Sequence, residues 1–136
     1  MYESLTCFLP ELLSTNEYGS WLVDTTGDGT LAHPYHSPEV DYSQTVEGLK
    51  VAAYNFAVEH PELGLADYAA VLREYGIDLA GPAVTDEQFA NLDGRAVAAL
   101  VIAATRVDRF VEGTMLSLLE ARQIQRWLAR LQELDA

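Results

Sequence analysis

The residues with the most distinctive chemistry lie in one short segment, residues 106–113. Arg106 and Arg109 are three positions apart, which places both guanidinium groups on one side of a helix. Guanidinium groups bind carboxylates and phosphates through paired hydrogen bonds. The segment therefore predicts either an anion site formed by the two arginines or a structural set of ion pairs that fixes the turn at Gly113 on neighbouring helices. Glu112 can reach back to Arg109 or to the turn of Asp108. We expect the apolar side chains of the segment to face the interior: Val107, Phe110 and Val111.

The balance of charge points to a second kind of interaction. The chain has 21 acidic and 8 basic residues, a formal net charge of −13, and Lys50 and Arg73 are the only bases in residues 1–94. Such a field repels phosphates, so we expect no direct nucleic-acid binding. An acidic surface can provide solubility alone, or it can imitate a phosphate backbone and occupy a basic groove of a partner protein. The candidate residues of this acidic face are Asp24, Asp28, Glu39, Asp41, Glu47 and Glu59.

The remaining polar residues predict no catalytic, cofactor or metal site. Residues 24–29 resemble the start of a calcium-binding loop, but Tyr35 stands where that loop requires a bidentate glutamate. His33 and His36 are separated by a proline, which prevents a helix from aligning their rings for a metal. The single cysteine, Cys7, excludes an internal disulfide, and we expect it to be a small buried side chain.

The N-terminal elements combine a small hairpin with a helix. The length and composition indicate one domain, residues 1–136, of the α+β class and mostly helical. Apolar runs at 21–23 and 31–35 flank a Gly-Asp-Gly core and predict one β-hairpin. Ser37-Pro38-Glu39 predicts the start of a helix, with Ser43 as a second possible start. That helix runs to His60, with an apolar stripe on its inner side and Glu39, Glu47 and Glu59 on its outer side.

The C-terminal third has the strongest helical pattern. Residues 96–111 are apolar on most faces, which is typical of a central core helix. Gly113 ends this helix, and residues 115–119 and 124–134 predict a short helix and a final amphipathic one. Thr85-Asp86-Glu87-Gln88 is a capping box that opens a brief helical turn.

Residues 105–113, followed by 124–131, resemble the C-terminal signature of a small bacterial family known only as domain-of-unknown-function family 6508. Weaker matches precede it in the family's order. The chain departs from the family pattern at Ala103-Ala104, where a Leu-Thr pair is usual, and at Ala121-Arg122, where the family tends to a glycine. The second departure predicts a continuous helix at that point, and the resemblance implies an architecture without a reaction. The weaker matches are Phe8-Leu9-Pro10, Tyr18-Gly19-Ser20-Trp21, Pro34-Tyr35 and Tyr42-Ser43.

These features favour a binding protein over an enzyme. No stretch reaches the roughly 18 unbroken apolar residues of a membrane span, and no basic region opens a signal peptide, so we expect a cytoplasmic protein without membrane contact. The sequence predicts a small acidic protein that binds a protein partner with a basic surface, for example a phage-type inhibitor (anti-CRISPR or anti-restriction) seated in a nucleic-acid groove. The alternative is a small enzyme or ligand-binding domain that holds an anionic ligand with Arg106 and Arg109.

Overall fold

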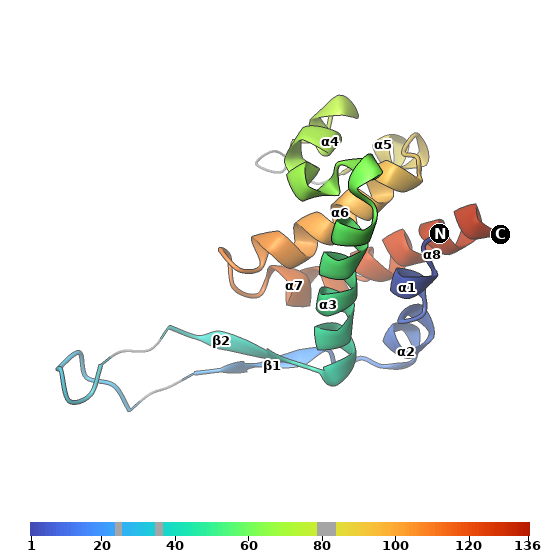
Figure 1. Ribbon diagram of the computed structural model, residues 1–136. Coiled ribbons are helices and arrows are strands. Elements are labelled where there is room, and N and C mark those ends of the chain that lie inside the picture. Colours follow the sequence, from blue (N-terminus) through green and yellow to red (C-terminus); the bar gives the residue numbers. More distant parts are fainter. Residues whose placement is uncertain (24–25, 35–36, 79–83) are drawn as a thin grey trace.

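Helices form most of the structure, and one two-stranded antiparallel sheet projects from them (Figure 1). The computed structural model describes residues 1–23, 26–34, 37–78 and 84–136. The predicted class, α+β and mostly helical, is confirmed. The elements are α1 (Glu3–Thr6), α2 (Leu9–Ser14), β1 (Gly19–Leu22), β2 (Glu39–Tyr42), α3 (Gln44–Glu59), the 3₁₀ turns η1 (Pro61–Leu63) and η2 (Leu65–Asp67), α4 (Tyr68–Glu74), α5 (Asp86–Ala90), α6 (Gly94–Val107), α7 (Thr114–Glu120) and α8 (Gln123–Asp135).

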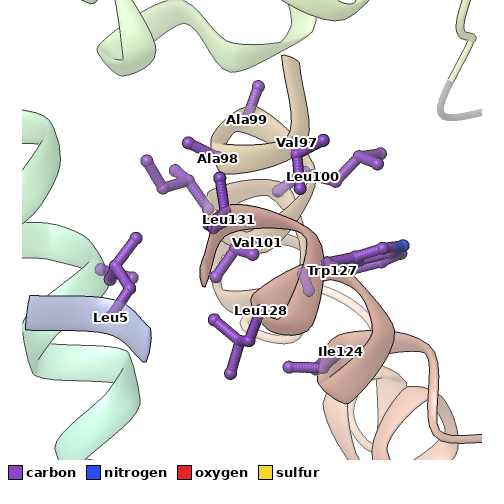
Figure 2. Packing of buried hydrophobic residues seen from close by; sticks show 14 of the residues in the cluster. Leu5, Val97, Ala98, Ala99, Leu100, Val101, Ile124, Trp127, Leu128 and Leu131 are labelled. Atoms are coloured by element: carbon purple, nitrogen blue, oxygen red, sulfur yellow. The ribbon is translucent and has the colours of Figure 1, made fainter. Parts of the chain in front are cut away.

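The central helix is α6, as its all-round apolar pattern predicted. Every residue from 96 to 105 is buried, and the helix packs against α3, α4, α7 and α8. The Asp93 carboxylate accepts a hydrogen bond from the backbone N–H of Ala96 at 2.9 Å and caps the start of α6. In Figure 2, Val101 of α6 and Leu128 of α8 belong to one cluster of buried side chains, with Leu5 of α1 beside it. This cluster is the frame on which the remaining elements are placed. Within the described ranges, no helix has the length and apolar character needed to cross a membrane.

Helix α3 begins at the second of the two predicted starts. The Ser43 hydroxyl accepts a hydrogen bond from Val46 N at 3.3 Å, which identifies Ser43 as the N-cap. The predicted start at Ser37-Pro38-Glu39 is wrong, because residues 39–42 pair with β1 as strand β2. The predicted inner stripe is confirmed, since all its members are buried: Val46, Leu49, Ala53, Phe56 and Ala57.

The hairpin exists, but its second strand is not the predicted one. β1 pairs with β2 in the register Gly19↔Tyr42 to Leu22↔Glu39, and residues 31–34 belong to the turn region. The Asp28 carboxylate accepts hydrogen bonds from Thr30 N and Oγ1 at 3.0 and 2.7 Å. His33 N donates to the Thr30 carbonyl at 3.2 Å, so this local turn extends into residues that were expected to form strand. We call the described residues 19–23, 26–34 and 37–42 the hairpin arm, which extends away from the helices from the base of α3 (Figure 1).

The chain reverses between α7 and α8, where a continuous helix was predicted. Arg122 has a φ of +61° and is the only described non-glycine residue with a positive φ. Its N–H donates to the carbonyl of Leu119 at 3.0 Å, and its Nη2 donates to Asn16 Oδ1 at 3.1 Å. The continuous-helix prediction is wrong because α7 and α8 pack on each other, and only a left-handed residue turns the chain sharply enough between them.

Candidate functional site

Residues 108–113 form the joint between the helices and the hairpin arm, and Asp108 is at its centre. The carboxylate of Asp108 is buried, and its Oδ1 accepts hydrogen bonds from the Tyr42 hydroxyl at 2.7 Å and from Met115 N at 3.0 Å. The Tyr42 oxygen in turn accepts a hydrogen bond from Leu116 N at 3.1 Å. These two acceptors satisfy N–H groups in the first turn of α7, whose own N-cap, Gly113, has no side chain to do so. One network therefore connects β2, the end of α6 and the start of α7.

Lys50 completes this network from α3. Its Nζ lies 3.6 Å from Asp108 Oδ2, 3.7 Å from Glu47 Oε1 and 4.0 Å from the centroid of the Tyr42 ring. Burial, together with the hydrogen bond to Asp108, raises the pKa of Tyr42 well above its ordinary value. The phenol therefore remains a hydrogen-bond donor at neutral pH, while Lys50 faces the Asp108 carboxylate.

Two further contacts attach the hairpin arm to the same joint. Glu112 Oε1 accepts a hydrogen bond from the backbone N–H of Val40 in β2 at 2.8 Å. Gly113 has a φ of +90°, and a Cβ at that position would lie 2.8 Å from Cη2 of the Trp21 ring in β1. Both the left-handed backbone and the nearby Trp21 ring thus favour glycine at residue 113. The motifs that the family resemblance combined, around Trp21, Tyr42 and Gly113, meet at this one place.

The two arginines do not form the predicted structural ion pairs. Glu112 is bound to β2 instead of Arg109, because the chain turns after Val107 and carries the carboxylate toward the arm. Arg109 is exposed, and its guanidinium has no hydrogen-bond or ion-pair partner among the described residues. Arg106 is half-buried and lies 5.5 Å from the centroid of the Tyr54 ring, again without an ion pair in the described ranges.

The apolar residues of the segment also differ from the prediction. Phe110 is 85% exposed and Val111 is 60% exposed, whereas both were expected to face the interior. Helix α6 ends at Val107, and the Phe110 N–H donates to the Val107 carbonyl at 2.9 Å in the turn that follows. The helical periodicity behind the prediction stops one turn too early to bury these side chains.

The described acidic residues are exposed but do not share one side of a helix. Asp28 lies near the tip of the hairpin arm, and Glu39 and Asp41 alternate with inward Val40 and Tyr42 on β2, so both carboxylates point to the outer face of the sheet. In the part of the chain that the structure describes, neither Glu39 nor Asp41 has a cation within ion-pair distance. The predicted helical placement of Glu39 is therefore wrong, because residues 39–42 form a strand.

The last three members of the predicted face lie at different places. Glu47 is in the first turn of α3, next to the base of the arm, and Glu59 is the last residue of the same helix. The two are about 18 Å apart along the helix axis at 1.5 Å per residue. Asp24 lies outside the described residues. Glu39 and Asp41 thus share the outer face of the arm, whereas Glu47 lies 3.7 Å from Lys50 in the network that contains Tyr42 and Asp108.

Sequence reasoning missed the buried half of the site. The residues predicted for this segment were Arg106, Arg109 and Glu112, and no role was predicted for Asp108, Tyr42 or Lys50. The signal that was available is the family pattern itself, which contains Tyr42-Ser43 and Asp108 together. Cys7, expected to be buried, is exposed, and its Sγ donates to the Ser4 carbonyl at 3.5 Å. Among the described residues, no group of three His, Cys, Asp or Glu side chains is placed to hold a metal ion.

Comparison with known proteins gives one family match, which covers the C-terminal part of the chain. No curated protein and no solved structure gives a significant match. The matching segment begins at Gly76 and contains α5 to α8, with Asp108, Glu112 and Gly113 of the joint. Residues 76–136 match the model of DUF6508, a family of unknown function.

Proposed function

We propose that the protein binds another protein through the carboxylates of its hairpin arm, and that the partner presents a basic groove built for nucleic acid. The observation that carries this proposal is the outer face of β2. Glu39 and Asp41 are exposed there, side by side on one face, and neither has a neutralising cation among the described residues. Carboxylates two residues apart on a strand are about 7 Å apart.

The charge of the whole chain supports a partner of this kind. A net charge of −13 attracts basic surfaces and repels phosphates, so the protein would bind the groove and not the nucleic acid itself. The joint gives the arm a fixed origin, since Tyr42, Glu112 and Trp21 attach it to the helices. An acidic arm held away from the body is suited to entering a groove. Such a protein would act as a phage-type inhibitor of the anti-CRISPR or anti-restriction class, in the cytoplasm of a bacterial cell.

A competition pull-down tests the proposal directly. The tagged protein is incubated with bacterial lysate, and captured proteins are then challenged with duplex DNA. Because DNA and the hairpin arm would occupy the same groove, we expect DNA to release the partner, while the tagged protein alone does not bind DNA. Partners that stay bound at every DNA concentration would contradict a shared groove.

A salt series with matched variants then identifies the arm as the binding element. Reversal of the two acids Glu39 and Asp41 to lysine should slow association with the captured partner, measured by surface plasmon resonance, more than it speeds dissociation. The control reverses two exposed acids elsewhere, Glu11 and Glu120, and changes the net charge by the same amount. Equal losses in both variants would show that only the overall charge matters, and would sink the proposal for the arm.

The second candidate is an anion site at Arg106 and Arg109, and one observation favours it. Neither guanidinium is paired with a carboxylate in the described ranges, although the chain has 21 acidic residues. Unpaired arginines beside an aromatic ring bind carboxylates and phosphates well. Isothermal titration with inorganic phosphate tests this candidate, and binding that Arg109→Ala abolishes would support it.

A further inference from the structure

Exposed apolar side chains lie on the outer face of α3, where Arg106 meets the Tyr54 ring, and directly after Arg109 in the chain. On the outer face of α3, Val51, Tyr54 and Val58 are all more than half exposed. Their spacing of three and four residues forms a stripe opposite the buried stripe of the same helix. Large connected apolar areas on a surface mark interaction sites, whereas scattered apolar residues do not. Helix α3 therefore has one apolar stripe toward the core and a second one without a partner among the described residues.

The turn after α6 extends this surface. The Arg106 guanidinium lies over the Tyr54 ring and so brings the end of α6 to the outer face of α3. Phe110 is one helical turn beyond Arg106, and it is 85% exposed. We call the combined surface the α3 patch; it consists of Val51, Tyr54, Val58, Arg106, Arg109, Phe110 and Val111.

The charges of the α3 patch define what can cover it. Arg106 and Arg109 have no carboxylate partner among the described residues, so burial of the patch by an uncharged or basic surface would leave guanidinium groups without compensation. The occupant must bring carboxylates next to an apolar side chain.

The outer face of the hairpin arm has this composition. Leu22 is 55% exposed and lies opposite Glu39 in the strand register, with Asp41 two residues further along β2 on the same face. A two-stranded hairpin is marginally stable in water by itself, so a projecting arm gains from being covered. The arm and the α3 patch thus complement each other both in charge and in apolar surface.

The arm cannot cover the patch of its own chain. Its inner face is attached to the joint, because the Tyr42 hydroxyl donates to Asp108, Trp21 lies against Gly113, and Val40 N donates to Glu112. Leu22, Glu39 and Asp41 alternate with these residues and so face away from the body. A second copy of the chain can bring the outer face of its arm to the patch.

We propose that two copies of this protein associate reciprocally, with the outer face of each hairpin arm on the α3 patch of the other copy. Leu22 packs on the apolar side chains of the patch, and Glu39 and Asp41 face Arg106 and Arg109. A two-fold axis makes both contacts identical, as in most homodimers. The proposal does not rest on the partner-binding function, but it bears on it: the dimer occupies Glu39 and Asp41, so dimerisation and partner binding exclude each other.

Charge exchange between the two halves of the contact provides a sharp test. The patch variant combines Arg106→Glu and Arg109→Glu, and the arm variant combines Glu39→Arg and Asp41→Arg. Sedimentation velocity of the purified full chain, from about 1 μM to 1 mM, measures the dimer dissociation constant. We expect either variant alone to raise this constant at least about tenfold, because like charges then meet at both contacts. In an equimolar mixture, however, one contact is native and the other is charge-reversed, so the two variants should form a heterodimer.

Two further variants separate the effect of this contact from the effect of overall charge. Glu59→Arg combined with Glu120→Arg changes the net charge as the arm variant does, at exposed positions outside the contact, and should not separate the dimer as the arm variant does. Phe110→Ser removes an exposed apolar side chain without altering charge, and should also weaken dimerisation. Circular dichroism verifies that each variant is folded.

The outcomes are distinct. A wild-type chain that remains monomeric at every concentration would overturn the proposal and leave the patch to a different acidic partner. A dimer that both variants retain, or a mixture that stays monomeric, would overturn it as well. Because only the purified chain is present, these results are independent of whether a partner with a basic groove exists.

Discussion

The Tyr42 hydroxyl donates a 2.7 Å hydrogen bond to Asp108 across 66 residues of sequence, and both side chains are buried. This contact connects the last residue of the hairpin arm to the end of the central helix. Through Met115 and Leu116 it also satisfies the first turn of α7. The direction of the arm and the start of α7 therefore depend on the same two side chains.

Removal of the Tyr42 hydroxyl should destabilise the protein. In Tyr42→Phe the Leu116 N–H loses its acceptor and Asp108 loses a donor, which we expect to lower the free energy of unfolding by about 1–3 kcal/mol and the melting temperature by several degrees. Thermal unfolding followed by circular dichroism measures both. The matched control is Tyr54→Phe, the same chemical change at an exposed tyrosine, which should stay within about 0.5 kcal/mol of wild type. Equal melting of both variants would contradict the role of the network.

Tyr42 should also make the protein sensitive to alkali. Burial and the Asp108 hydrogen bond raise the pKa of Tyr42 in the folded state above the ordinary value of 10.0. Above pH 10 the unfolded state therefore binds fewer protons than the folded state, so this contribution to stability is complete below about pH 10 and is lost as the pH rises toward the folded-state pKa. Urea unfolding at pH 8 to 11.5 should show a steeper alkaline loss for wild type than for Tyr42→Phe. The pKa values of Tyr2 and Tyr75 are also raised, by burial and by the hydrogen bond to Asp93 respectively, and these residues retain part of the dependence in the variant. Parallel pH profiles would show that Tyr42 is ionised equally in both states.

Substitution of Gly113 tests the contact of the arm with the α6–α7 turn. Gly113→Ala imposes a left-handed backbone on a residue with a Cβ, at a cost of about 1–2 kcal/mol, and in addition drives the new methyl group into the Trp21 ring. Gly76→Ala provides the control, because Gly76 has a φ of +76° and its added Cβ meets nothing within 4 Å. We expect a larger loss of unfolding free energy for Gly113→Ala, together with a red shift of Trp21 fluorescence that Gly76→Ala does not produce. Identical losses in the two variants would mean that Trp21 moves aside without cost.

Asp108 and Arg109 are adjacent in sequence, but replacement by alanine should lower the free energy of unfolding at Asp108 and leave it almost unchanged at Arg109. Asp108→Ala leaves the Tyr42 hydroxyl and Met115 N without an acceptor, and we expect a loss of about 1–3 kcal/mol. Arg109→Ala removes an exposed, unpaired side chain and should change stability by less than about 0.5 kcal/mol. Chemical denaturation at micromolar protein concentration is the measurement, because dilution separates folding from association. A large loss of unfolding free energy for Arg109→Ala would contradict this expectation and would favour the structural ion pairs predicted from the sequence.

Much of the helical architecture follows from the sequence alone, because its cause is local. The buried stripe of α3 and the capping box in which Gln88 N donates to Thr85 Oγ1 at 3.1 Å depend on residues a few positions apart, whereas the choice of Ser43 over Ser37 as the start of α3 does not. Local spacing carries this information, since a helix satisfies its hydrogen bonds within its own segment. A hairpin with its first strand near Trp21 was also predicted from the sequence, but its second strand was placed at residues 31–35 instead of 39–42.

The pairing and the burial of charge were decided by the tertiary structure. β1 pairs with residues 39–42 and not with the apolar run that begins at residue 31. This pairing allows Tyr42 to donate to Asp108 and Val40 N to donate to Glu112, contacts that span 66 and 72 residues of sequence. Nothing in the spacing of residues 106–113 distinguishes the buried carboxylate of Asp108 from the exposed guanidinium of Arg109. Their environments are set by what packs against the end of α6: Lys50, Tyr42 and the first turn of α7 surround Asp108, and no described residue pairs with Arg109. A strand finds its hydrogen-bond partners, and a carboxylate its donors, in other segments, so only the folded arrangement determines which of these residues join the core and which remain on the surface.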